Sequence, residues 1–172
     1  MSQTRPLLPE TNEKSASISE GVWHSQHRRL TLGLILLTLG PAFEGLAVAT
    51  ILPRIVANLG GLSLYGWSFS AYMLATIIGL ILAGDEADRK GPALPFTIGV
   101  SLFVLGLILA GTASSMLIFV LSRGVQGLGA GTIASVAYVC LGRGYPVQLK
   151  PAMIAILASA WVVPGLIGPA LA

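Results

Sequence analysis

Long apolar segments separated by short polar connections dominate the chain after residue 29. Each segment is close to the ~20 residues that an α-helix needs to cross the hydrocarbon core of a bilayer. The prolines, glycines and charges between the segments mark the connections. We therefore predict about five membrane spans, at residues 30–53, 67–83, 96–113, 117–140 and 152–172.

Residues 1–29 differ from the rest of the chain. They contain prolines, serines and charges of both signs but show no apolar periodicity. Such a composition cannot bury enough apolar surface to fold. We therefore expect a flexible cytoplasmic tail over 1–29 and the membrane helices over 30–172.

Composition identifies lipid as the solvent of the apolar segments. The chain is 54% hydrophobic and 10% charged, and its mean hydropathy is +0.82. A soluble core of this size cannot hide so many apolar side chains. The fold class predicted from these observations is an all-α membrane protein.

The positions of the basic residues predict the orientation in the membrane. Of the 10 Lys and Arg residues, all but Arg54 and Arg123 lie in the tail or in the connections after the second and fourth spans. Because basic residues are enriched on the cytoplasmic side, the N-terminus is expected in the cytoplasm. The net charge of +3 is scattered rather than gathered in a patch, so nucleic acid is not an expected partner.

Cys140 is the single cysteine of the chain and cannot form an internal disulfide. Nothing near it in the sequence suggests a metal ligand set or an activated nucleophile, so we interpret it as a small packing residue. We expect no catalytic residue, no metal and no cofactor in this protein.

Two charged residues, Glu44 and Arg123, fall inside predicted spans. A guanidinium in hydrocarbon costs about 2.5–3.5 kcal/mol, so Arg123 needs a partner or a cavity. Glu44 lies about 13 Å below the outer end of the first span, at a level similar to that of Arg123 in the fourth. Because these spans run in opposite directions, we expect the two side chains to come within reach across an inner cavity. Two structural alternatives are that the pair only holds the helices together and that Arg123 extends to the outer interface.

The connection Gly84–Pro95 is short and rich in charge. It predicts a tight hairpin at the membrane surface, since Gly84 and Gly91 adopt backbone angles that other residues resist and the prolines stop a helix. Asp88 and Arg89 are expected to bond to helix ends or to each other.

The spacing of Gly84, Asp88, Arg89 and Gly91 resembles the loop between helices 2 and 3 of major facilitator superfamily transporters, G-x-L-A-D-R-x-G-R-K. Glu86 stands where that pattern has Leu, and Pro92 and Ala93 replace its last basic residues. The four matching residues are implied to act as a conformational latch.

The segment Arg123–Gly131 resembles the second superfamily motif, R-x-x-Q-G-x-G-A, and matches it at every defining position, including Gln126. Gly127 and Gly131 lie about one helical turn apart, a spacing that allows another helix to approach closely.

The segment Pro164–Ala172 resembles the helix 5 motif of exporters in this superfamily, G-x-x-x-G-P-x-x-G-G. Gly168 and Pro169 match, and Pro164 stands in place of the first Gly. The prolines are expected to bend this helix, while Gly165 and Gly168 allow tight packing.

Two further segments resemble the drug:proton antiporter branch. Glu44–Pro53 is similar to D-x-T-x-V-N-x-A-L-P of the fourteen-helix antiporters, although Glu replaces Asp. Trp67, Tyr72 and Leu74 are similar to W-x-x-x-x-Y-x-L at the start of helix 2.

These resemblances imply five transmembrane helices of a six-helix N-terminal half, with a C-terminal transporter half as partner. They imply proton-coupled efflux of a lipophilic, cationic drug-like compound across the cell membrane by alternating access, driven by the proton gradient. The residues implied to couple protons and to line the substrate cavity are Glu44, Tyr72, Arg123 and Gln126.

Two alternatives remain open at the level of sequence. One is a facilitator or symporter that imports a sugar or another metabolite. The other is a membrane interaction protein that transports nothing. The sequence downstream of residue 172 discriminates between a transporter and the interaction protein.

Overall fold

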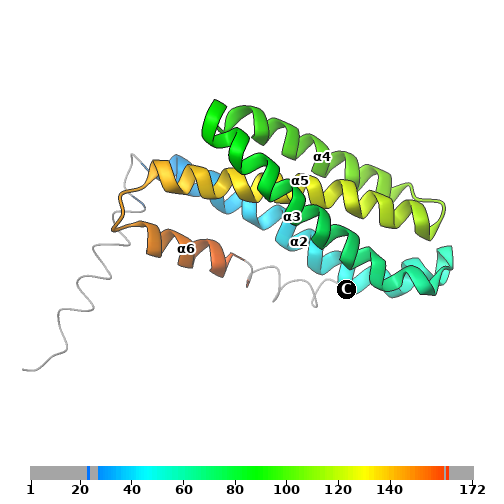
Figure 1. The fold of residues 1–172 in the computed structure, drawn as a ribbon. Helices are drawn as coiled ribbons and strands as arrows, with labels where there is room; N and C mark the ends of the chain where they lie inside the picture. The colour runs from blue at the N-terminus through cyan, green and yellow to red at the C-terminus, as the bar shows by residue number, and fades with distance from the viewer. Residues whose placement is uncertain (1–22, 24–26, 161, 163–172) are drawn as a thin grey trace, which may run out of the picture.

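The computed structural model describes Trp23, residues 27–160 and Val162 (Figure 1). This part of the chain is helical, and no strand occurs in it. Its elements are α2 (Arg28–Leu59), the short 3-10 helix η1 (Leu62–Leu64), α3 (Tyr65–Lys90), α4 (Ala93–Gly111), α5 (Met116–Gly144) and α6 (Lys150–Ser159).

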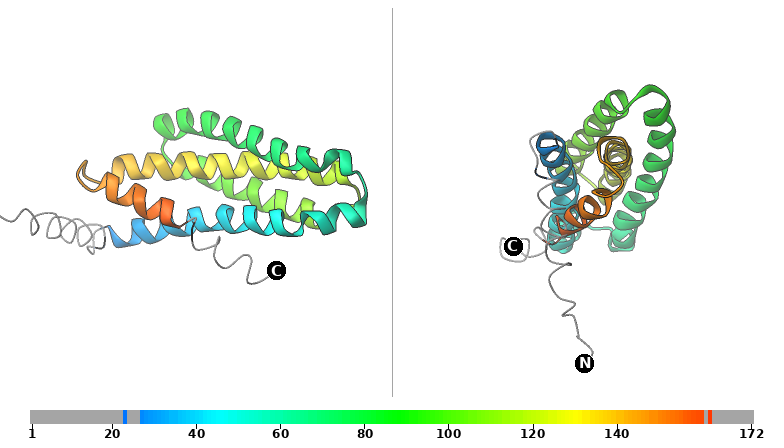
Figure 2. Two further views of the ribbon diagram at one scale, coloured as in Figure 1. Left: turned by 90° about the horizontal axis from the view of Figure 1, so that it is seen from below. Right: turned by 90° about the vertical axis from the view of Figure 1, so that its left-hand side faces the viewer.

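Four helices, α2 to α5, lie side by side and alternate in direction (Figures 1 and 2). Each is long and apolar enough to cross a bilayer. Large apolar side chains such as Leu36, Ile81 and Leu121 point away from the bundle, each more than half exposed, and suit contact with lipid. We call the end at which α3 passes into α4 the Asp88 end, and the end at which α4 passes into α5 the Ser115 end.

The central helix is α5, which packs between α3 and α4. Its glycines allow backbone to approach backbone. A Cβ atom on Gly131 would lie 2.0 Å from the carbonyl oxygen of Thr76 in α3, and one on Gly129 would lie 2.4 Å from the backbone nitrogen of Phe103 in α4. These glycines therefore allow α5 to pack closely against α3 on one side and α4 on the other.

Helix α2 contacts α5 at three levels. Near the Asp88 end the hydroxyl of Thr31 lies 2.7 Å from that of Tyr145, the residue directly after α5. In the middle Glu44 contacts Arg123. Toward the Ser115 end Leu52 of α2 belongs to an apolar cluster with residues at the start of α5. Helix α2 is therefore held against α5 along its length.

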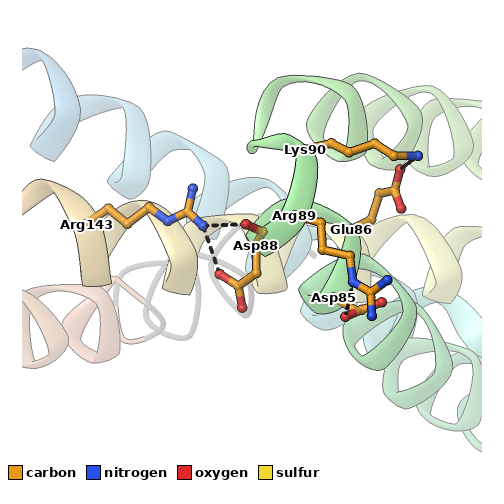
Figure 3. Close-up of polar contacts among 6 residues, drawn as sticks. All are labelled: Asp85, Glu86, Asp88, Arg89, Lys90 and Arg143. Atoms are coloured by element: carbon orange, nitrogen blue, oxygen red, sulfur yellow. Dashed lines mark hydrogen bonds and ion pairs between the residues drawn. The ribbon is translucent and has the colours of Figure 1, made fainter.

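The hairpin predicted at 84–95 is wrong in its first part, because α3 continues through Gly84 to Lys90. Ion pairs between residues four apart support this extra helix: Arg89 with Asp85 at 3.0 Å and Lys90 with Glu86 at 2.8 Å (Figure 3). The prediction treated a cluster of charges as a loop, whereas this spacing favours a helix.

The connection between α3 and α4 consists of Gly91 and Pro92 alone. Gly91 has φ 92°, a left-handed angle that favours glycine and ends α3. Pro95, predicted to stop a helix, lies in the first turn of α4, where the missing N–H has no intrahelical partner to lose.

The predicted end of the first span at Pro53 is also wrong. Helix α2 contains Pro53 and continues to Leu59. A proline removes one backbone hydrogen bond, which membrane helices tolerate when neighbours compensate. The helix ends where Gly60 adopts φ 69°.

About half of the fifth predicted span lies outside the described residues. Helix α6 begins that segment with 10 residues and packs on α2 and α5 through Met153 and Leu157.

The glycine contacts lead to a first prediction. Gly131→Ala should lower the free energy of unfolding by about 1–3 kcal/mol, because the new methyl group meets backbone atoms that cannot rotate away. Gly124→Ala is the matched control, since no atom of a neighbouring helix lies within 4 Å of its Cβ position. Thermal unfolding of the full-length gene product in detergent measures both, and equal melting temperatures would refute the contact.

Candidate functional site

A cluster of polar side chains from three helices lies in the interior of the bundle. Glu44 comes from α2, Tyr72 from α3, and Arg123 and Gln126 from α5. Only 2% of Arg123 and 0% of Gln126 are exposed, and Glu44 is buried as well. A charged pair this deep in a membrane protein marks a functional site by default.

Arg123 is the centre of the cluster. Its Nη1 atom donates hydrogen bonds to Oε1 of Glu44 and to Oε1 of Gln126. The ring of Tyr72 covers one face of the guanidinium, with Cζ 4.1 Å from the ring centroid. A carboxylate, an amide oxygen and an aromatic face together stabilise a charge that lipid cannot solvate.

Three buried atoms of the cluster make no hydrogen bond to a described residue: Oε2 of Glu44, Nε of Arg123 and Nε2 of Gln126. One of them is an acceptor and two are donors. The cluster therefore keeps capacity for a proton or for a polar ligand group.

The geometry brings together all four residues that the sequence suggested for coupling and cavity. Glu44 and Arg123 were expected to face each other across a cavity, but they are in direct contact. The alternative in which Arg123 extends to the outer interface is wrong for the same reason. Whether these residues move protons stays a prediction.

A second polar contact lies at the Asp88 end. Arg143 of α5 donates from Nη2 to the backbone oxygen of Asp88 at 2.9 Å and to its carboxylate at 3.2 Å (Figure 3). Asp88 therefore joins α3 to α5. The expected bond between Asp88 and Arg89 is absent among the described contacts, because Arg89 pairs with Asp85.

The sequence reasoning missed Arg143 as a partner of Asp88. One signal was available, since the predicted topology puts both residues at the same membrane surface. Of the other proposed latch residues, Gly84 lies against Ser135, whose Oγ would be 3.2 Å from an added Cβ, and Gly91 makes the turn.

The site residues predicted for a bend in helix 5 lie outside the described part of the chain. They are Pro164, Gly165, Gly168 and Pro169. Their role stays a prediction.

Comparison with known proteins identifies the family of this chain. A family model of the Major Facilitator Superfamily matches residues 30–172. The chain belongs to the Major Facilitator Superfamily. Its all-α membrane fold is the N-terminal part of that superfamily's fold, and the protein is a multi-pass membrane protein.

Several bacterial relatives in the superfamily are similar to most of this chain. The multidrug transporter protein MdtP of Bacillus subtilis is 30% identical over 145 residues, which cover 84% of this chain and 27% of that protein. Multidrug resistance protein 3 of the same organism is 29% identical, covering 83% and 28%. The multidrug efflux pump SdrM of Staphylococcus aureus is 26% identical, covering 81% and 31%. The chain thus spans about a quarter to a third of the length of these superfamily proteins.

The buried pair leads to a second prediction. Arg123→Ala should lower the free energy of unfolding by about 3–5 kcal/mol, because it leaves the Glu44 carboxylate buried without its cation. Adding Glu44→Gln to Arg123→Ala should recover part of that loss. The control is the exposed pair Asp85 and Arg89, whose removal should cost less than about 1 kcal/mol.

Chemical or thermal unfolding in detergent supplies these values. A double variant that loses as much as the two single variants together would contradict a coupled pair.

Proposed function

We propose that this chain forms part of a proton-coupled exporter that moves a lipophilic, cationic compound out of the cell by alternating access. The observation that carries the proposal is the buried contact of Glu44 with Arg123 in the middle of antiparallel membrane helices. The printed names of the bacterial relatives, which are multidrug transporters and efflux pumps, support drug export as the activity.

Glu44 supplies the competition on which antiport depends. One of its oxygens accepts from Arg123, while Oε2 has no partner among the described residues. A proton on this carboxyl group removes the negative charge that would attract a cation, so proton and substrate exclude each other. Burial favours the protonated form of this carboxyl group, whereas the positive charge of Arg123 favours the ionised form. Reversible exchange requires that both forms be accessible.

The Asp88 contact is proposed as the latch of the outward-facing state. It links the end of α3 to the end of α5 through an exposed, charge-assisted bond. Such a bond contributes little to stability in water and breaks readily. It is therefore suited to a contact that forms and opens in each transport cycle.

The described basic residues support a cytoplasmic N-terminus in the cell membrane. Arg28 and Arg29 at the start of α2, Lys90 at the end of α3, and Arg143 and Lys150 all lie at the Asp88 end. This is the bias expected for the cytoplasmic surface.

The proposed partners are the bilayer, the transported small molecule and a C-terminal transporter half. The proposal requires no cofactor, since the proton gradient supplies the energy. It involves no covalent change of the substrate and no nucleic acid.

The third prediction tests the proton site. Glu44→Gln in the full-length gene product should abolish pH-driven efflux of a cationic dye from vesicles, because an amide neither takes up a proton nor attracts a cation. Glu86→Gln is the control, since Glu86 is a carboxylate at the Asp88 end, away from the cluster, and pairs with Lys90. If Glu44→Gln still exchanges protons for substrate at the parental ratio, Glu44 is not the coupling site.

The fourth prediction tests the latch. Asp88→Asn should abolish transport while leaving the amount of protein in the membrane unchanged, because the amide loses the ionic part of the bond to Arg143. Arg143→Gln should reproduce the defect, and Asp85→Asn should not. Vesicle uptake and quantitative immunodetection give the two readouts, and parental transport by Asp88→Asn would rule out a latch.

A further inference from the structure

We propose that Tyr72 is a positioning residue, whose ring holds the Arg123 guanidinium against Glu44 and thereby sets proton exchange without touching the substrate. The inference rests on the proposed function of Glu44 as the proton site. It assigns to the aromatic ring a contact with Arg123 that the resemblance to the antiporters does not specify.

The hydrogen bonds of Arg123 do not fix its guanidinium by themselves. Both go through one atom, Nη1, which donates to Glu44 and to Gln126. Nε makes no hydrogen bond to a described residue. The group is otherwise attached only through its flexible side chain, so its plane can still rotate about the line through Nε and Nη1. A contact with its flat face is needed to keep it in place.

The Tyr72 ring supplies that contact. It lies against the flat face of the guanidinium, with Cζ 4.1 Å from the ring centroid. A cation over an aromatic face is attracted by the ring's quadrupole, and more strongly where water is excluded. The ring therefore opposes rotation of Arg123 away from Glu44.

The ring, and not the hydroxyl group, carries this role. No hydrogen bond links the Tyr72 hydroxyl to any residue that the structure describes. Phenylalanine keeps the aromatic face and should therefore replace tyrosine, whereas leucine is apolar and smaller and has no aromatic face.

The fold sets the height of the ring through Gly127. This glycine lies one helical turn after Arg123, and a Cβ atom on it would be 2.3 Å from the carbonyl oxygen of Tyr72. The backbone of α3 therefore rests on α5 at the residue that carries the ring. A side chain at position 127 would lift Tyr72 from Arg123.

The titratable groups around the cluster come from three helices. Glu44 faces it from α2, Tyr72 from α3, and Arg123 with the neutral Gln126 from α5. Helix α4 contains no titratable side chain. A change in the pH dependence on altering Tyr72 thus reports on the Glu44 and Arg123 pair.

The test compares Tyr72→Phe with Tyr72→Leu in the full-length gene product, reconstituted in vesicles with a cationic dye. Tyr72→Phe should keep the parental pH profile. Tyr72→Leu should displace the pH of half-maximal exchange toward alkaline values by about one unit, because the carboxylate then lacks a fixed cation. The KM for the dye should stay within about twofold of the parental value if the ring acts only through Arg123.

Gly127→Ala provides a second route, with Gly124→Ala as its matched control. It should displace the pH profile in the same direction as Tyr72→Leu although the ring is intact, and Gly124→Ala should not. A raised KM with an unchanged pH profile in Tyr72→Leu would overturn the inference in favour of substrate contact. Loss of exchange in Tyr72→Phe, or a parental profile in Tyr72→Leu, would overturn it as well.

Failure of the proposed function is recognised separately. If the parental protein exchanges no protons, or Glu44→Gln exchanges them normally, the proposed function fails whatever Tyr72 does. The contact is then judged in detergent, where Tyr72→Leu should lower the melting temperature in the parental background but not in an Arg123→Leu background. Equal losses in both backgrounds would refute the positioning role.

Discussion

The close approach of α5 to both α3 and α4 is the constraint on which the rest of the structure depends. In lipid the burial of apolar surface gives helices little reason to associate, so tight packing has to supply the attraction. Gly127 and Gly131 admit the backbone of α3, and Gly129 admits that of α4. Each of these contacts also fixes the depth and rotation of a neighbouring helix, so the same glycines decide which side chains meet in the interior.

Burying the interior polar cluster in a membrane costs free energy, and the contacts within the cluster lower that cost. Glu44 and Arg123 neutralise each other, while Gln126 and the Tyr72 ring contact the guanidinium from other directions. A well-packed apolar group would serve stability equally well or better. The cluster instead contains a protonatable carboxyl group and three polar atoms without a hydrogen-bond partner among the described residues. A purely structural support would be expected to satisfy all of its polar atoms, so these features favour the proposed role in transport.

The cluster and the Asp88 contact sit on the same central helix. Arg123 lies in the first half of α5 and Arg143 near its end, so one rigid element connects the buried pair with the exposed ion pair at the Asp88 end. A shift of α5 relative to α2 and α3 would alter both contacts together. In the proposed mechanism, this arrangement links protonation inside the membrane to opening at the surface.

The sequence by itself determined the membrane class, the approximate helices and the two buried charges, because length, hydropathy and the cost of a charge in lipid are local properties. The predicted helix ends were wrong where contacts with neighbouring residues decide them. The ion pairs of Arg89 and Lys90 extend α3, and α2 continues past Pro53. Only the tertiary structure shows that Arg143 is the partner of Asp88 and that the Tyr72 ring packs against Arg123. Those choices depend on the rotation and depth of packed helices, which no single segment encodes.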